Sequence, residues 1–334
     1  MTEPRVTLAE IAAEAGVSLA TMSKVLNGRT DVSPATRTRL EAELKRHGYT
    51  KRSAGRRSET IELVFHELES SWSMEVIAGV EEVAHAAGLS VLLTVSGDRH
   101  APADDWIDGV LRRRPLGVVL VFSDLASPHR DKLRSRGVPF AIVDPAGDPA
   151  PDVPSVGSAN WSGGLLATRH LIELGHTRIA AITGPEDMMC SLARVDGYRS
   201  AMNAAALPVD PDWVRFGDFH PAGGQNHARE LLSRPDRPTA VFAGSDLQAL
   251  GVIAAATEAG LSVPRDLSVV GYDDIALARW LSPQLTTVHQ PLRRMGEEAT
   301  RIVLRLAEGE SVDTLRMDLA THLVVRGSTA PPAA

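Results

Sequence analysis

The sequence predicts an α/β protein: a small N-terminal helical domain, followed by a larger body of two lobes with doubly wound parallel sheets. Three observations predict this fold class. The first segment carries the boundary signals of three short helices, and the body alternates short apolar strands with helical stretches. Charge also divides at this boundary, because residues 1–58 hold 11 basic and 6 acidic residues and the remainder holds 24 and 36.

The bulk properties limit the class of protein. A chain of 334 residues is long enough for two or three domains, and its 43% hydrophobic content is typical of a soluble globular protein. No apolar run approaches the roughly 20 residues of a membrane span. The N-terminus lacks the apolar core of a signal peptide, so we expect a cytoplasmic protein. The basic first segment indicates contact with a polyanion, although a solvated basic face would give the same charge count.

The first segment is expected to form three helices. The first begins at Thr7, where TLAE forms a capping box, and ends at Gly16, which suits a left-handed cap. Ser18 caps the second, LATMSKVLN. The third begins at Ser33, with a proline in its first position, and ends at Gly48. Two helices joined by a tight turn are typical of a helix-turn-helix.

A helix-turn-helix places its second helix in the major groove of DNA. On that helix Lys24 can donate to guanine, while Leu19 and Ala20 can contact a thymine methyl group. Short hydroxyl and amide side chains suit phosphate oxygens. The predicted DNA-contacting residues of this segment are Thr7, Leu8, Leu19, Ala20, Thr21, Ser23, Lys24, Asn27 and Ser33. A three-helix bundle whose hydroxyls only cap helices is the alternative.

From Ile61 onward, strands and helices alternate. The expected strands include IELVF, LSVLLTV, LGVVLVF, PFAIVD, RIAAITG, AVFAG and LSVVGYD. The expected helices include MEVIAGVEEVAHAAG, DDWIDGVLRR, GGLLATRHLIELG, VDGYRSAMNAAAL and LQALGVIAAATEAG. Such alternation indicates βαβ units with a parallel sheet covered on both faces. Two successive blocks predict two lobes, with a ligand cleft at the carboxyl ends of their strands.

The helical segment also carries a family resemblance. The stretch VTLAEIAAEAGVSLATMSKVLNGRTDVSPATRTRLEAELKRHGY resembles the DNA-binding headpiece of the LacI/GalR family of transcriptional regulators. The stretches RHLIELGHTRIAAITGP, RVDGYRSAM and DLQALGVIAAATEAGLSVPRDLSVVGYDDIALARWLSPQLTTVHQP are similar to the effector-binding body of that family. The resemblance implies a periplasmic-binding-protein type I fold, in which LTTVHQP marks the return to the first lobe and HLVVRGST a last return to the second.

The resemblance also implies effector-binding residues. Arg194, Asp273 and Gln290 match family positions that commonly bind the effector. Five further residues match cleft-lining positions more loosely, namely His66, Trp72, Asp144, Phe219 and Ser245. Ser245 stands where many relatives have Asn. The alternatives are that Arg194 is a helix-surface residue paired with Asp196, and that Trp72 belongs to the core.

The segment YTKRSAGRRSET connects the two parts and holds four basic residues. The family has a hinge here that usually reads Y-x-P-N-x-x-A-R-x-L and inserts its Leu into the minor groove. In this chain Lys51 and Arg52 replace Pro-Asn, and Ser58 stands where the Leu is expected. We therefore expect no leucine insertion. Arg56 and Arg57 are expected to contact phosphates or a narrow minor groove, and a solvated linker is the alternative.

Enzyme functions are not supported by the sequence. It lacks the G-x-G-x-x-G, G-x-x-x-x-G-K-[ST] and G-x-S-x-G motifs, and its histidines have no metal-binding spacing. Its one cysteine, Cys190, resembles a buried small side chain. We expect no cofactor and no metal.

We therefore expect a transcriptional regulator, a repressor of carbohydrate-utilisation genes, that binds a pseudo-palindromic operator as a homodimer and responds to a sugar-like effector. The expected domains are a headpiece at 1–48, a basic linker at 49–60 and an effector-binding, dimerising body at 61–334. The alternatives are a cytoplasmic sugar-binding protein without gene control and a sugar-converting enzyme.

Overall fold

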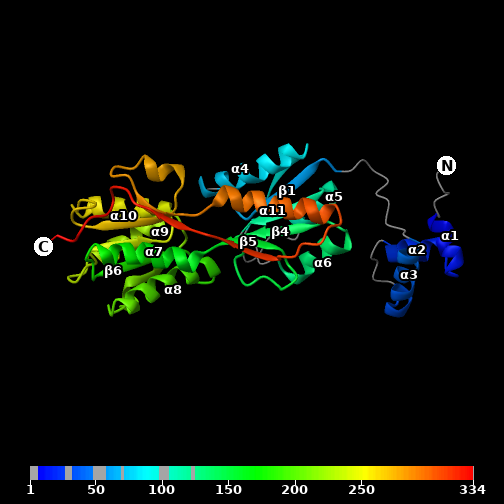
Figure 1. The fold of residues 1–334 in the computed structure, drawn as a ribbon, viewed down its shortest axis with the longest axis horizontal. Coiled ribbons are helices and arrows are strands. Elements are labelled where there is room, and N and C mark those ends of the chain that lie inside the picture. Colours follow the sequence, from blue (N-terminus) through cyan, green and yellow to red (C-terminus); the bar gives the residue numbers. More distant parts are fainter. Residues whose placement is uncertain are drawn as a thin grey trace.

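The computed structural model describes residues 7–26, 32–47, 58–68, 71–97, 105–121 and 125–333. The predicted DNA contacts Asn27, Arg56 and Arg57 lie outside these residues. Within the described ranges, no helix is both long and apolar enough to cross a membrane. Three short helices come first and two helix-covered sheets follow, which confirms the predicted fold class (Figure 1).

The headpiece helices are α1 (Leu8–Glu14), α2 (Leu19–Leu26) and α3 (Pro34–Arg46). The capping box of α1 is confirmed, because the Thr7 hydroxyl accepts from the Glu10 amide and the Glu10 carboxylate accepts from the Thr7 amide. The Ser18 and Ser33 hydroxyls accept from amides three residues later, as expected for N-caps. The three helices enclose a small core of Ile11, Ala12, Met22, Val25, Leu40 and Leu44.

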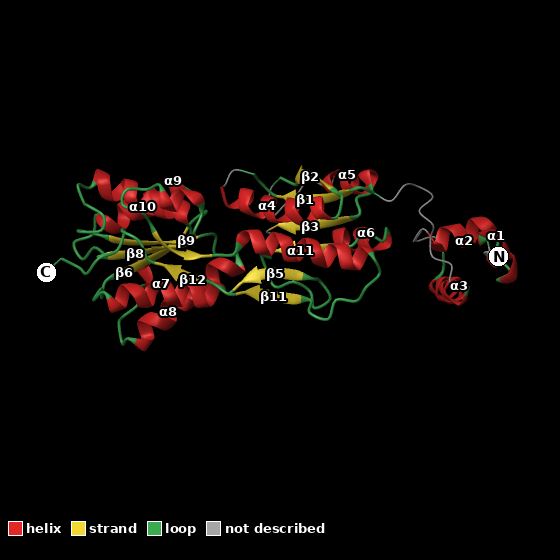
Figure 2. Cartoon of the chain, turned by 45° about the horizontal axis from the view of Figure 1, so that its top comes forward, coloured by secondary structure: helices red, strands yellow, loops and turns green. Residues whose placement is uncertain are grey.

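The first lobe contains a parallel sheet in the order β11-β5-β4-β3-β1-β2. Its strands are β1 (Thr60–Phe65), β2 (Ser90–Val95), β3 (Gly117–Val121), β4 (Phe140–Val143), β5 (Ser155–Ser158) and β11 (Arg316–Leu319). Helices α4 (Ser71–Ala86) and α11 (Leu292–Ala307) share one hydrophobic cluster with the sheet, whereas α5 (Asp105–Arg113) and α6 (Ser127–Ser135) share another. Neighbouring residues of β1 enter different clusters, as expected for a sheet covered on both faces (Figure 2).

The second lobe repeats this plan with the order β12-β10-β9-β8-β6-β7, in which β12 alone is antiparallel to its neighbour. Its strands are β6 (Ile179–Thr183), β7 (Val214–Phe216), β8 (Ala240–Ala243), β9 (Ser268–Asp273), β10 (Thr286–His289) and β12 (His322–Val324). Helices α7 (Asn160–Glu173) and α8 (Met189–Ala204) cover one face, and α9 (Pro221–Leu232) and α10 (Asp246–Glu258) cover the other. Two short 3-10 turns, η1 (Pro211–Trp213) and η2 (Ala276–Arg279), lie in its loops.

The chain passes between the lobes three times, from β5 to α7, from β10 to α11 and from β11 to β12. The stretch LTTVHQP lies at the second crossing as predicted, but β10 itself still belongs to the second sheet and the return begins with α11. The last return at HLVV is confirmed as β12. Three segments of chain therefore join the two lobes.

Polar residues follow the carboxyl ends of strands in both lobes. His66 follows β1, Asp144 follows β4, Asp273 ends β9 and Gln290 follows β10. Since the strand ends of an open parallel sheet meet at one edge, these side chains gather where the lobes face each other.

Candidate functional site

A cavity of about 240 Å³ lies between the two lobes. The first lobe contributes residues from the end of β1 and from α4, and the second contributes residues from the starts of α8, α9 and α10 and from the end of β9. Six of the predicted effector-binding residues line it: His66, Trp72, Arg194, Phe219, Ser245 and Asp273. Trp72 also belongs to the first-lobe core, so this residue is both a core residue and part of the cavity lining.

Arg194 lies at the centre of the site with 3% of its surface exposed. Its Nε donates to Asn160 Oδ1 at 2.8 Å, its Nη1 to the Gly244 carbonyl at 2.5 Å and its Nη2 to Gln290 Oε1 at 3.2 Å. The guanidinium also lies 3.8 Å from the centre of the Tyr272 ring. Asp196 pairs instead with Arg199, so the interpretation of Arg194 as a surface residue is wrong.

Two buried carboxyl groups flank Arg194. Asp273 is 6% exposed, and its Oδ1 accepts no hydrogen bond from the described residues. Burial raises the pKa of Asp273 well above its usual range, although the positive charge of Arg194 opposes the rise. Asp273 also has a positive φ of 108°, a strained backbone conformation that is often found at functional sites.

Asp144 and Gln290 lie behind Arg194 and do not line the 240 Å³ cavity. Gln290 is 1% exposed, accepts from Arg194 and donates to the sulfur of Met295. Asp144 lines a neighbouring cavity of about 200 Å³ on the side of the crossing segments. Burial raises the pKa of Asp144 to about 6, partly opposed by Arg194. These two residues therefore reach the interlobe cavity only through Arg194.

Ser245 does not offer its hydroxyl to the cavity. The Oγ accepts from the Gln248 amide at 3.0 Å as the N-cap of α10, and it donates to the Phe219 carbonyl at 2.8 Å. Phe219 has a positive φ of 65°, and its ring lies so close to Gly184 that an added Cβ there would meet it at 2.1 Å. Ser245 therefore positions Phe219, whose ring lies 5.5 Å from the Arg194 guanidinium.

The lining includes three polar residues that sequence reasoning missed: Glu67, Asp218 and His220. Glu67 Oε1 lies 3.4 Å from Nε2 of His66 and 3.4 Å from Nε2 of His220, which belongs to the second lobe. Asp218 accepts from the His220 amide at 2.9 Å. The sequence signal for two of them was a position just past a strand, where polar residues reach the cleft: Glu67 is the second residue after β1, and Asp218 is the second after β7.

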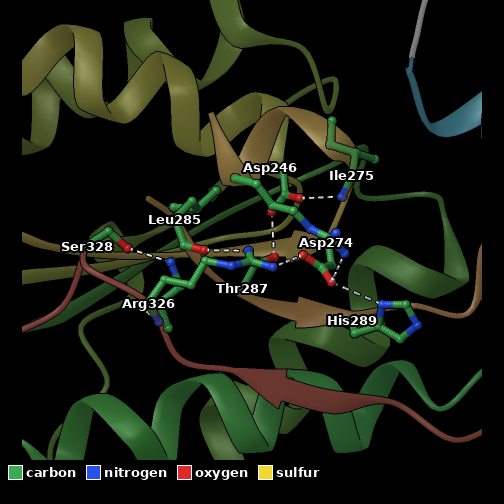
Figure 3. A network of polar contacts seen from close by, with 10 residues as sticks. Asp246, Asp274, Ile275, Leu285, Thr287, His289, Arg326 and Ser328 are labelled. Atoms are coloured by element: carbon green, nitrogen blue, oxygen red, sulfur yellow. Dashed lines mark hydrogen bonds and ion pairs between the residues drawn. The ribbon is translucent and has the colours of Figure 1, made fainter. Parts of the chain in front are cut away.

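A polar network beside the cavity fastens the crossing segments to the second lobe (Figure 3). Asp274 accepts from Arg326 at 2.5 Å and contacts His289 Nδ1 at 3.3 Å. Arg326 also donates to the Leu285 carbonyl. Asp246 at the start of α10 accepts from the Thr287 hydroxyl and from the Ile275 amide. The end of β9, the strand β10 and the C-terminal segment are thus held together.

In the headpiece, Leu19, Ala20 and Lys24 are exposed on α2, as predicted for residues that face DNA. Thr7 and Ser33 are exposed, whereas Thr21 and Ser23 are half-buried. Leu8 differs from these exposed residues, because its side chain packs against the headpiece core. Arg46 at the end of α3 pairs with Glu14 at the end of α1, which joins two of the three helices.

Comparison with known proteins decides the family. Residues 7–51 match the model of bacterial regulatory proteins of the lacI family, and residues 168–329 match a periplasmic binding protein-like domain. The chain is 37% identical to the HTH-type transcriptional regulator CelR of Thermobifida fusca, over 97% of this chain and 98% of that protein. The chain belongs to the LacI family.

Solved structures of LacI-family proteins support this family assignment. The chain superposes on a CelR–cellobiose complex with a TM-score of 0.75 and 36% identity, covering 97% of this chain and all of that one. It superposes on a lac repressor dimer bound to operator with a TM-score of 0.72 and 28% identity, covering 98% and 100%. The predicted family and fold are confirmed, and the chain is a DNA-binding transcriptional regulator of this family rather than an enzyme.

Cys190 is a buried free thiol, as predicted from the sequence. The side chain is 3% exposed in the wall of the cavity, and burial raises the pKa of its thiol to about 12. A thiol with so high a pKa stays protonated at neutral pH and is a poor nucleophile.

Proposed function

We propose that this LacI-family protein is a repressor of carbohydrate-utilisation genes whose operator affinity is set by a sugar-like effector in the cavity between the lobes. One observation carries the proposal: residues of both lobes line the cavity around a buried arginine and a buried carboxyl group, one oxygen of which accepts no hydrogen bond from the described part of the chain. A ligand that contacts both lobes has a different affinity for each lobe arrangement, and therefore shifts their equilibrium.

The proposed parts keep the boundaries expected from the sequence: a headpiece at 1–48, a basic linker at 49–60 and a body at 61–334. The exposed side chains of α2 are proposed to contact bases, and Thr7, Thr21, Ser23, Asn27 and Ser33 to contact the backbone. Arg56 and Arg57 of the linker are proposed to contact phosphates or the minor groove. One headpiece reaches few bases, so we propose a cytoplasmic homodimer on a pseudo-palindromic operator.

In the cavity, Arg194 and Asp273 are proposed to contact the effector directly, with Phe219 and Trp72 against its C–H face and His66 at its edge. Gln290 and Asp144 are proposed to keep the Arg194 side chain in place. Ser245 is proposed to affect effector binding indirectly, by positioning Phe219. The CelR–cellobiose complex supports a carbohydrate effector, since that relative shares the fold over almost the whole chain.

Two linked measurements test this function. Selection from a random library of duplex DNA with the full chain should yield a pseudo-palindromic site, to which a panel of mono- and disaccharides is then added. We expect at least one sugar to raise the melting temperature and to change operator affinity, because a ligand that binds the native state stabilises it. Selection of no duplex would favour a sugar-binding protein without gene control, and turnover of a sugar would favour an enzyme.

A further inference from the structure

We propose that the effector is an uncharged sugar, and that the cavity rejects phosphorylated and carboxylated sugars. This inference rests on the proposed function of the cavity as the effector site. It follows from the charges on the cavity walls and from the hydrogen bonds that their cationic groups already make.

Three carboxyl groups line the cavity: Glu67 from the first lobe, and Asp218 and Asp273 from the second. As carboxylates, Glu67 and Asp218 accept hydrogen bonds from neighbouring sugar hydroxyls but repel a phosphate or another carboxylate. Asp273 does not add to this repulsion, because burial raises its pKa and favours the neutral carboxyl. Asp273 is more than nine-tenths buried and has an oxygen that no described residue donates to, so it retains an acceptor for a hydroxyl donor. The walls thus match a ligand that brings donors without negative charge.

The permanent cation of the lining, Arg194, is held by the protein itself. Its three nitrogens donate to Asn160, Gly244 and Gln290, and its face is covered by Tyr272. A phosphate site normally needs a guanidinium that offers two parallel N–H groups to the anion. Three of the five N–H groups of Arg194 are already donated within the protein, and a neutral hydroxyl needs only one of the two that remain.

Histidine is the other residue type in the described lining that can carry positive charge. His66 and His220 both lie 3.4 Å from the same oxygen of Glu67. A proton on either ring is therefore paired with Glu67 before any ligand arrives. With one ring protonated, the three residues carry no net charge that would attract an anion.

Helix starts are the remaining place where a protein binds anions, because the first amides of a helix have no partner within it. Three helices start at this cavity, and each start already holds an acceptor from the chain. In α8 the Met189 amide donates to the Ala146 carbonyl at 2.7 Å, and in α10 the Gln248 amide donates to Ser245. The α9 helix begins with a proline, and the Asp218 carboxylate lies over its first turn.

The test uses the full chain and sugar pairs that differ by one charged group: glucose with glucose 6-phosphate and glucuronate, ribose with ribose 5-phosphate, and cellobiose as a neutral disaccharide. Calorimetric titration gives the Kd of each. For every sugar that binds, we expect the charged counterpart to bind at least 100-fold more weakly. A charged sugar that binds as tightly as its neutral partner overturns this inference and leaves the proposed function standing. If no sugar in the panel binds, the proposed function fails, and this inference fails with it.

Two variants test whether the cavity carboxylates cause the discrimination against charged sugars. Glu67→Gln and Asp218→Asn remove charge while keeping the side-chain shape and an acceptor oxygen. We expect each to reduce the discrimination between neutral and phosphorylated sugar at least 5-fold. The ratio compares two ligands on one protein, so a loss of stability does not produce this result. Asp196→Asn is the matched control, because this exposed acid on α8 pairs with Arg199 outside the cavity. Full discrimination in both cavity variants would overturn the assignment to these carboxylates.

Discussion

The Asp274 carboxylate and the Arg326 guanidinium form an ion pair at 2.5 Å, and this pair fastens the C-terminal segment to the end of β9 (Figure 3). The two side chains are only 5% and 11% exposed, so water does little to screen them. Arg326 belongs to the segment that has just made the last crossing between the lobes. The pair is therefore part of the structure that sets how the second lobe is joined to the first.

The first prediction concerns this pair. Asp274→Asn should lower the free energy of unfolding by about 3 kcal/mol, because it leaves a buried guanidinium without its counter-charge. Arg305→Ala is a suitable control, since its pair with Glu310 is about half exposed and should contribute less than about 1 kcal/mol. Urea titration of both variants measures the difference. Equal losses would show that burial does not strengthen the Asp274 pair.

The second prediction concerns the positioning of Phe219. Ser245→Ala should cost about 1 kcal/mol of stability through the lost N-cap, and should also weaken effector binding because Phe219 loses its backbone anchor. Ser245→Thr keeps the hydroxyl and should restore binding. Ser233→Ala, outside the cavity, serves as control. Calorimetric titration separates the two effects, and unchanged affinity in Ser245→Ala would remove Ser245 from the binding site.

The third prediction concerns pH. Burial raises the pKa of Asp144 from its ordinary 3.8 to about 6, so the folded state retains a proton that the unfolded chain releases. Asp144 therefore lowers stability as pH rises from about 4 to 6, and its cost is complete above pH 6. Asp144→Asn should raise the free energy of unfolding at pH 7.5 by up to about 3 kcal/mol and change it little at pH 4. Urea titration without effector at the two pH values measures this, and a gain that is equal at both would contradict it.

The fourth prediction concerns DNA. Replacing Arg56 and Arg57 with Ala should weaken operator binding and flatten its dependence on salt, because fewer counterions are released from the DNA. Lys24→Ala should weaken binding and also relax base preference, since Lys24 is exposed on the helix proposed to enter the groove. Arg229→Ala, on α9 in the second lobe, should leave the salt slope unchanged. Fluorescence anisotropy over a range of salt concentrations measures all three, and an unchanged slope in the double variant would favour a plain linker.

Local signals in the sequence were sufficient for much of the fold. The caps at Thr7, Ser18 and Ser33 depend on contacts only three residues apart, so the headpiece helices could be placed from the sequence. Apolar runs such as those of β3 and β4 identify strands buried on both faces. The short strand β5, SVGS, gave no such signal, because its place in the sheet depends on pairing with β4 and β11 rather than on its own composition.

The sequence by itself determined the headpiece, the alternation of strands and helices, and the residue types that reach the cleft. Only the tertiary structure decided their partners. Arg194 donates to residues 34, 50 and 96 positions away in the chain, and no sequence period encodes such separations. The same holds for Glu67, which meets His220 only because β1 ends and α9 begins at the same interlobe space. Long-range contacts depend on how the two sheets are placed relative to each other. The charges that line the cavity could therefore be identified only from the tertiary structure.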